Sequence, residues 1–163
     1  MIKFAKKDKS VKIPSRLDTN AGYDIYANFD LPFMKLKAHK TTLVPTGLFS
    51  SFDKEYYIQM FNRGSNGSKG LLQACGVIDS SYRGEWFVAI TNTNDTDWYI
   101  AKQEYVSSLP DDMIKNTFYP YEKAICQFVI LPVPKIEITE VSLDEIKNDI
   151  SNRGNGKIGS SGK

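Results

Sequence analysis

Short strand-like segments separated by turn residues dominate this chain. Residues 56–61 and 85–92 alternate apolar and polar side chains, 41–49 are rich in β-formers, and 124–133 read as a strand that ends among prolines. Few stretches carry the three-to-four-residue period of a long helix. This pattern favours an all-β fold, specifically a jelly-roll-like β-sandwich.

Two short helices are expected beside the strands. Residues 66–72 are predicted to form a short helical turn. Residues 141–148 place Asp144 and Glu145 early and Lys147 late, which is the charge order that a helix dipole favours.

Bulk composition excludes several classes of protein. The 163 residues suffice for one domain, and a formal net charge of +2 with scattered lysines does not make a nucleic-acid-binding surface. No apolar run approaches the roughly 20 residues of a membrane-spanning helix, and the lysine-rich start lacks the apolar core of a signal peptide. We therefore expect a cytoplasmic protein that binds neither nucleic acid nor membrane.

Side chains that commonly carry metal or nucleophilic chemistry are scarce. Cys75 and Cys126 are far apart in sequence and lack a Cys-x-x-Cys partner, which argues against a disulfide framework and a zinc site. We expect both to be small buried side chains. His39 is the only histidine, so triads and histidine–metal sites lack a second partner, and a position in a surface loop is expected.

The chain divides by composition into a sandwich domain, residues 1–150, and a glycine-rich tail, residues 151–163, which we expect to be mobile and to act as a C-terminal lid.

Residues 95–121 are predicted to be an insertion. Its large side chains are Trp98, Tyr99, Tyr105, Met113, Phe118 and Tyr119. They are of the types enriched at protein interfaces, but packing onto the parent domain is the preferred explanation.

Three glycine-containing runs can carry chemistry. Gly76–Gly84 sets Asp79 after a short strand, where a carboxylate can deprotonate water or merely accept turn hydrogen bonds. Arg63–Gly70 combines an arginine, hydroxyls and small residues, which suits a phosphate, although its spacing is not that of a P-loop and a solvated turn is an equal alternative. Arg153–Gly162 has the composition to wrap a triphosphate, or is a disordered tail or linker.

These runs, together with two others, resemble the five motifs of the trimeric dUTPase family, and they occur in the family's order over nearly the whole chain. The segments are Thr19–Ala27, Arg63–Gly70, Gly76–Gly84, Ala124–Phe128 and Arg153–Gly162. The resemblance implies hydrolysis of dUTP to dUMP and pyrophosphate, which limits uracil in DNA and supplies dUMP for dTMP synthesis. It also implies a homotrimer whose active sites draw motifs from different subunits.

The resemblance also implies roles for single residues. Asp79 would activate the attacking water, Gln127 would bind near that water, and Asp24 would lie near the phosphates and their hydrated metal. Mg²⁺ would be held by the triphosphate and water, with no direct protein ligand. Phosphate contacts would come from Arg63, Gly64, Ser65 and Arg153. Base, sugar and lid contacts would come from Gln73, Gly76, Val77, Ile78, Tyr82, Phe87, Ile158, Gly159 and Ser160.

Three departures from the family pattern stand out. Gly64 occupies the place of the usual serine of the second motif, so Ser65 is the candidate to supply the hydroxyl. Ile158 replaces the aromatic residue that would stack over uracil, which predicts weaker closure. Glu122 replaces a turn glycine, and the segment before it is longer than in common members, as in some phage-encoded ones.

Two alternatives remain open from the sequence. A dCTP deaminase shares the fold and the phosphate site, but it requires a glutamate placed for proton transfer at the cytosine amino group. A regulatory protein that keeps the nucleotide site could engage a protein partner through residues 95–121.

Overall fold

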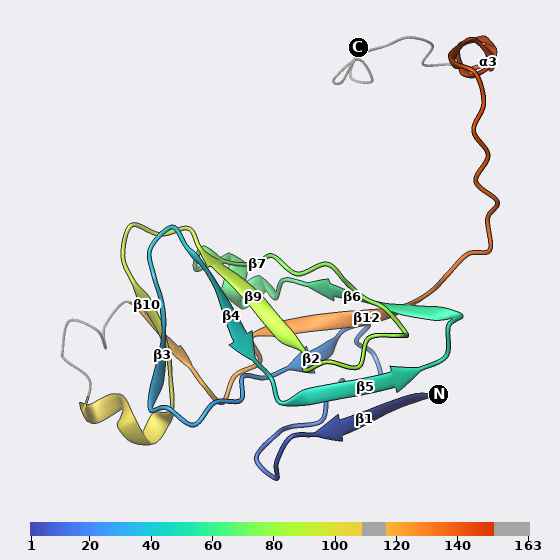
Figure 1. Ribbon diagram of the computed structural model, residues 1–163. Coiled ribbons are helices and arrows are strands. Elements are labelled where there is room, and N and C mark those ends of the chain that lie inside the picture. Colours follow the sequence, from blue (N-terminus) through green and yellow to red (C-terminus); the bar gives the residue numbers. More distant parts are fainter. Residues whose placement is uncertain (109–116, 152–163) are drawn as a thin grey trace. The chain divides into compact units, whose positions relative to one another are not determined.

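Among the described residues, four small β-sheets form the body of the molecule, as the alternating segments predict. The computed structural model describes residues 1–108 and 117–151, and the all-β prediction is confirmed over these residues (Figure 1). One sheet pairs β1 (Ile2–Lys6) with β5 (Leu48–Phe52), and a second has the order β4 (Thr41–Pro45), β9 (Phe87–Asn92), β7 (Leu71–Gln73). A third has the order β11 (Phe118–Pro120), β10 (Trp98–Ala101), β3 (Phe33–Leu36).

The fourth sheet has the order β2 (Tyr23–Ile25), β12 (Cys126–Pro132), β6 (Tyr56–Phe61), β8 (Val77–Ile78). Its pairings are antiparallel, and Gln127 lies opposite Asp24 on one side and Phe61 on the other. Because side chains alternate along a strand, Cys126 and Phe128 enter the core while Gln127 faces outward. This sheet therefore presents one face to the core and one to the functional site.

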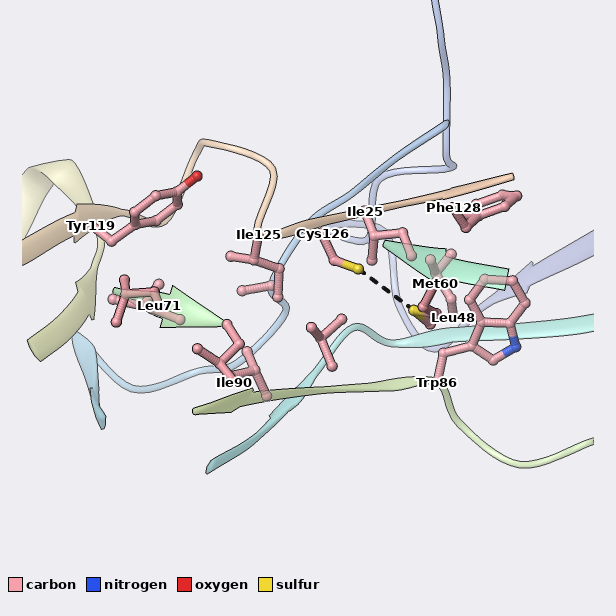
Figure 2. Packing of buried hydrophobic residues seen from close by; sticks show 14 of the residues in the cluster. Ile25, Leu48, Met60, Leu71, Trp86, Ile90, Tyr119, Ile125, Cys126 and Phe128 are labelled. Carbon is pink, nitrogen blue, oxygen red and sulfur yellow. Dashed lines mark hydrogen bonds between the residues drawn. The ribbon is translucent and has the colours of Figure 1, made fainter. Parts of the chain in front are cut away.

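Aromatic rings join the sheets in the core. The Phe128 side chain is fully buried, and its ring centroid lies 5.2 Å from Tyr23, 5.5 Å from Trp86 and 6.2 Å from Phe4. Figure 2 shows Phe128 and Trp86 at one end of the cluster and Tyr119 at the other. The Trp86 Nε1–H donates to Ser50 Oγ at 3.1 Å, which satisfies its one polar atom.

The two cysteines differ in environment. Cys126 is buried as predicted, and burial raises the pKa of its thiol to about 12, so it is inert at neutral pH. Its sulfur lies 3.6 Å from the Met60 sulfur (Figure 2). The expectation for Cys75 is wrong, because this side chain is only partly buried at the edge of a cleft. His39 lies in an exposed turn as predicted, with a φ of 53°.

Glycines explain two differences from the predicted elements. The segment 41–49 is two strands, because Gly47 adopts a φ of 67° between β4 and β5. The helix predicted at 66–72 is wrong in extent. The helical turn α1 covers Gly64–Gly67, Gly70 turns the chain with a φ of 68°, and the buried Leu71 begins β7.

Much of the predicted insertion, residues 95–121, belongs to the body. Strand β10 pairs with both β3 and β11, and Trp98, Tyr99 and Tyr119 are buried. These three aromatics therefore pack onto the parent domain. A 3₁₀ helix, Gln103–Ser108, follows β10. Met113 lies outside the described residues.

A separate unit begins at Pro134, so the compact body ends at Val133 and the boundary expected after residue 150 falls inside the second unit. Residues 134–151 are exposed throughout. The predicted helix is present as α3 (Leu143–Asn148), with Ser142 Oγ accepting from the Glu145 backbone N–H at 3.1 Å. Residues 152–163, and with them the predicted lid, lie outside the described residues. No helix of the described part is long and apolar enough to cross a membrane.

The Phe128 ring predicts a large stability effect. Phe128→Ala should destabilise the fold by about 3–5 kcal/mol, because it leaves a cavity where three rings meet. Leu43→Ala, at a side chain that is 63% exposed, is the control and should change stability by less than about 1 kcal/mol. Urea unfolding measures both, and equal midpoints for the two variants would contradict this account of the core.

Candidate functional site

A cleft of about 980 Å³, here called the Arg63 cleft, opens on the outer face of the fourth sheet. Its lining combines two arginines, a carboxylate and several neutral polar groups, which suits an anionic ligand with hydrogen-bonding groups. The lining residues are Ser15, Arg16, Leu17, Thr19, Asn20, Ala21, Gly22, Asp24, Phe61, Asn62, Arg63, Gln127 and Val129.

Arg63 and Asp24 form a bidentate ion pair within this cleft. Arg63 Nε lies 3.1 Å from Asp24 Oδ1, and Nη2 lies 3.4 Å from Oδ2. Arg63 Nη1 also donates to the Ala124 carbonyl at 3.2 Å. Both charged side chains are about 30% exposed, so the guanidinium is held in place yet reachable by a ligand from the cleft.

Gln127 is fixed beside this pair. Its Nε2 donates to the Asn62 carbonyl oxygen at 2.9 Å. Gly22 makes room for the amide, because a Cβ at residue 22 would lie 2.6 Å from Gln127 Oε1. With Nε2 engaged, Oε1 is the end of the amide that is directed toward Gly22.

One arginine shapes the loop that forms the cleft's other wall. Arg16 Nη1 lies at 3.1, 2.8 and 2.8 Å from the carbonyl oxygens of Leu17, Asp18 and Asn20, respectively. Its guanidinium carbon is 5.2 Å from the Tyr23 ring centroid, and its hydrogen bond with the Tyr23 side chain raises the pKa of Arg16. This loop is therefore set by side-chain-to-backbone contacts, and no local sequence pattern predicted it.

The turn after Arg63 carries the other predicted phosphate ligands. Gly64 and Ser65 are exposed on α1, next to the cleft but outside its lining. Asn66 is 1% exposed, and its Nδ2 donates to the Ile125 carbonyl at 2.7 Å. The turn is thereby attached to the residue that precedes β12.

A second, smaller cleft of about 230 Å³, here called the Asp79 cleft, holds residues of the third motif. It is lined by Met60, Cys75, Val77, Ile78, Asp79, Tyr82, Glu85, Trp86 and Phe87. The Tyr82 hydroxyl donates to the Glu85 carbonyl at 2.8 Å. Gly84 leaves room for the Tyr82 ring, which would have to shift if residue 84 carried a Cβ.

The Asp79 carboxylate is exposed at the cleft, and it makes no hydrogen bond or ion pair with any residue that the structure describes. The backbone around it is ordered by a turn, in which Tyr82 N–H donates to the Asp79 carbonyl at 3.1 Å. A fixed backbone with an unengaged carboxylate leaves both oxygens free to accept hydrogen bonds from water.

The hairpin beside this cleft has many of its main-chain groups engaged. Gln73 Nε2 donates to the Cys75 carbonyl at 2.6 Å, and Met60 N–H donates to the Gly76 carbonyl at 3.1 Å. The Cys75 sulfur accepts from Ala89 N–H at 2.8 Å. These contacts hold the hairpin in place, and they include the thiol of Cys75, a side chain that the sequence predicted to be buried.

The two clefts are apart on one chain. Ile78 is opposite Ile58 on β6, whereas Gln127 is opposite Phe61 on the same strand. Ile78 and Gln127 are therefore offset by three residues along the strands and by two strand spacings across the sheet, which together put their backbones about 14 Å apart. Gln127 Nε2 also points to Asn62, away from Ile58. Asp79 and Gln127 of one chain are therefore not arranged around one water molecule.

The predicted site residues thus fall into groups. Asp24, Arg63 and Gln127 share the Arg63 cleft, whereas Val77, Ile78, Asp79, Tyr82 and Phe87 share the Asp79 cleft. Gly64 and Ser65 lie on the adjoining turn, and Gln73 and Gly76 on the hairpin. Arg153, Ile158, Gly159 and Ser160 lie outside the described residues.

Comparison with known proteins adds a family to this geometry. A family model described as dUTPase matches residues 9–109. The deoxyuridine 5'-triphosphate nucleotidohydrolase of Fusobacterium nucleatum subsp. nucleatum is 29% identical over 161 residues, covering 96% of this chain and 94% of that protein. The Finegoldia magna protein of the same name is 31% identical over 131 residues, covering 78% and 75%.

Solved structures share the fold. The dUTPase of Staphylococcus bacteriophage 80alpha, solved with dUPNHPP, aligns with a TM-score of 0.74 at 23% identity, covering 100% of this chain and 99% of that chain. The native EIAV dUTPase aligns with a TM-score of 0.63 at 17% identity, covering 88% and 98%.

Proposed function

The chain belongs to the dUTPase family, and on that premise we propose that it hydrolyses dUTP to dUMP and pyrophosphate, with Asp79 as the general base. The observation that carries the proposal is the unengaged Asp79 carboxylate, held on an ordered turn in a cleft with Tyr82 and Phe87. Relatives covering most of this chain are named for this activity.

In the proposed reaction, Asp79 accepts a proton from a water molecule that attacks the α-phosphorus of dUTP. The new P–O bond forms as the bond from the α-phosphorus to the bridging oxygen breaks, and pyrophosphate leaves. The protein contributes mainly position and charge. Arg63 suits the inner phosphates because its guanidinium is fixed at two points yet reachable from the cleft.

Magnesium fits the donors of the Arg63 cleft as an ion bound by the substrate. Asp24 is the carboxylate of this cleft, and it is paired with Arg63, so it suits hydrogen bonding to a metal's water ligands better than direct ligation. No cluster of three metal-ligating side chains occurs among the described residues. When bound to the triphosphate, Mg²⁺ neutralises charge on the departing pyrophosphate.

The Asp79 cleft suits the deoxynucleoside. Its walls from Val77, Ile78 and Phe87 are apolar. In the hairpin from Gln73 to Gly76 the Cys75 and Gly76 carbonyls are engaged within the chain, so the main-chain groups left for a base are those that these contacts do not use. Uracil would be selected by these groups, since a base with the wrong donors leaves buried polar atoms unpaired. Tyr82 would lie against deoxyribose and leave no room for a 2'-hydroxyl.

A homotrimer accounts for the two separate clefts. We propose that the Arg63 cleft of one subunit faces the Asp79 cleft of another, so that a single dUTP spans both. The second unit favours association as well, because Ile136, Ile138 and Ile150 are 74%, 95% and 102% exposed. Arg153, Ile158, Gly159 and Ser160 would close the site from a tail.

A dCTP deaminase is not favoured by the cleft. Among the described residues that line the Asp79 cleft, the glutamate is Glu85. Its Oε1 accepts a hydrogen bond from the Gly47 backbone N–H at 2.9 Å. A carboxylate engaged in this way is poorly placed to shuttle protons at a cytosine amino group.

Pyrophosphate release tests the activity directly. The wild-type protein should release pyrophosphate from dUTP far faster than from dCTP, dTTP or UTP. Asp79→Asn should reduce the turnover number by at least about 100-fold with dUTP binding retained, because an amide cannot accept the water's proton. Asp30→Asn, at an exposed carboxylate outside both clefts, is the control. Near wild-type turnover by Asp79→Asn would overturn the mechanism.

Mixed oligomers test the shared site. Asp79→Asn damages one half of each site and Arg63→Ala the other half, so each variant alone should be nearly inactive. Random 1:1 subunit exchange should restore about a quarter of wild-type activity, because each site then has a one-half chance of receiving each intact half from a different subunit. If refolded mixtures shown by mass spectrometry to contain both subunits stay inactive, each site is built within one chain.

A further inference from the structure

The orientation of the Asn66 amide is determined by its surroundings. This side chain is 1% exposed, and one end lies 2.7 Å from the Ile125 carbonyl oxygen. Only the amide nitrogen can donate to a carbonyl, so Nδ2 must face Ile125. Oδ1 is consequently directed to the other side, toward the turn that follows Arg63.

Oδ1 of Asn66 meets the Ser65 hydroxyl. The Ser65 Oγ lies 3.3 Å from this oxygen, and because Oδ1 has no hydrogen, Ser65 must be the donor. This contact selects one orientation of an otherwise exposed serine. It is long for a hydrogen bond between a hydroxyl and a carbonyl oxygen. An incoming anion can therefore replace Oδ1 as the acceptor of the Ser65 hydrogen bond at low cost in free energy.

The same asparagine attaches the turn to the strands of the Arg63 cleft. The Ile125 peptide accepts from Asn66 and donates its N–H to the Ile25 carbonyl at 2.8 Å. Ile25 follows Asp24, and Gln127 lies two residues after Ile125. Asn66 therefore sets where Ser65 stands relative to both groups.

Gly64, the neighbouring residue on the turn, provides an internal test. A Cβ at residue 64 would meet no atom within 4 Å, and its φ is not in the left-handed region. A serine fits there without strain. Its Cβ would lie more than 4 Å from the Asn66 side chain, so this hydroxyl would not rely on Asn66 for its place on the turn.

We propose that Asn66 is a positioning residue for substrate phosphate, holding the Ser65 hydroxyl as the donor on a turn that has no hydroxyl at residue 64. The proposal rests on the proposed function, since it assumes that the turn binds a nucleotide phosphate. Asn66 acts through Ser65 and through the Ile125 carbonyl, and it does not touch the substrate.

Binding of dUDP and of deoxyuridine separates positioning from a structural role. Asn66→Leu keeps the branched shape of the side chain but removes both Oδ1 and Nδ2, and it should weaken dUDP binding about tenfold, as Ser65→Ala should, while deoxyuridine binding stays unchanged. The loss should not grow further in the double variant Ser65→Ala/Asn66→Leu. Isothermal titration calorimetry gives all four affinities, and melting temperatures report the accompanying change in stability.

Rescue by Gly64→Ser is the second measurement. Added to Asn66→Leu, it should recover most of the lost dUDP affinity, because its hydroxyl does not depend on residue 66. Asn28→Leu is the matched control. Asn28 is also a buried asparagine in contact with a serine, at 2.8 Å from Ser10, and its loss should lower stability without changing dUDP affinity. Asn66→Ser, whose smaller side chain leaves room for water at Ile125, replaces Asn66→Leu if the latter does not fold.

Three results would overturn the proposal. The first is no dUDP binding by the wild-type protein, and the second is an equal loss of affinity for dUDP and for deoxyuridine in the Asn66 variant. The third is that Asn66→Leu lowers dUDP affinity by the same factor in Ser65→Ala protein as in wild-type protein. Absence of pyrophosphate release from dUTP by wild-type protein that still binds dUDP would instead contradict the proposed activity and leave the role of Asn66 to be judged on binding alone.

Discussion

The register of β12 against its two neighbours is the constraint on which the rest of the site depends. This strand is paired along both edges, so Gln127 has Asp24 on one side and Phe61 on the other. A slip by one residue would turn Gln127 into the core and Phe128 out of it. Burial of Phe128 among three other rings opposes that slip, so the core determines the geometry of the polar face.

The Arg63–Asp24 pair connects that register to electrostatics. An arginine without a partner in a partly buried cleft would lose hydration free energy that no other interaction offsets. Asp24 supplies the compensating charge, and the Ala124 carbonyl takes a further donor. The pair therefore keeps the guanidinium extended in the absence of ligand. Because both charges remain partly exposed, phosphate can engage Arg63 without first breaking a fully desolvated ion pair.

Local patterns in the sequence predicted a good part of this arrangement. Alternation identified β6 over Tyr56–Phe61 with correct bounds, because one face of that strand is buried and the other is not. The division of the segment 41–49 into two strands was not predicted. Its break depends on Gly47, which adopts a left-handed conformation and whose backbone N–H and carbonyl bond to Glu85 and Lys7, residues distant in sequence. Likewise, the burial of β10 depends on pairing with β3, over 60 residues earlier, which no local period encodes.

The site residues were predicted from the order of the motifs, and strand register limits what such a prediction can say about their arrangement. Motifs name the residues, but they do not say which of them share a cleft. That depends on strand register, which separates Ile78 from Gln127 by three positions on β6. Contacts from side chain to backbone, such as those of Arg16 and Asn66, are also absent from motifs because any loop carbonyl can be their partner.

In the proposed trimer, a site divided between chains would couple catalysis to assembly. Contacts within the chain hold Arg63 and Gln127 in one cleft and the Gln73–Gly76 hairpin beside the other, so in such a trimer the distance across a complete site would be set mainly by how the subunits pack. An interface variant that shifts one subunit by about 1 Å would thus act like a change in the site itself, since catalysis depends steeply on the positions of the reacting atoms. In the proposed trimer, residues on the outer face of β6 and β12, such as the 45% exposed Phe61, would affect activity as well as stability.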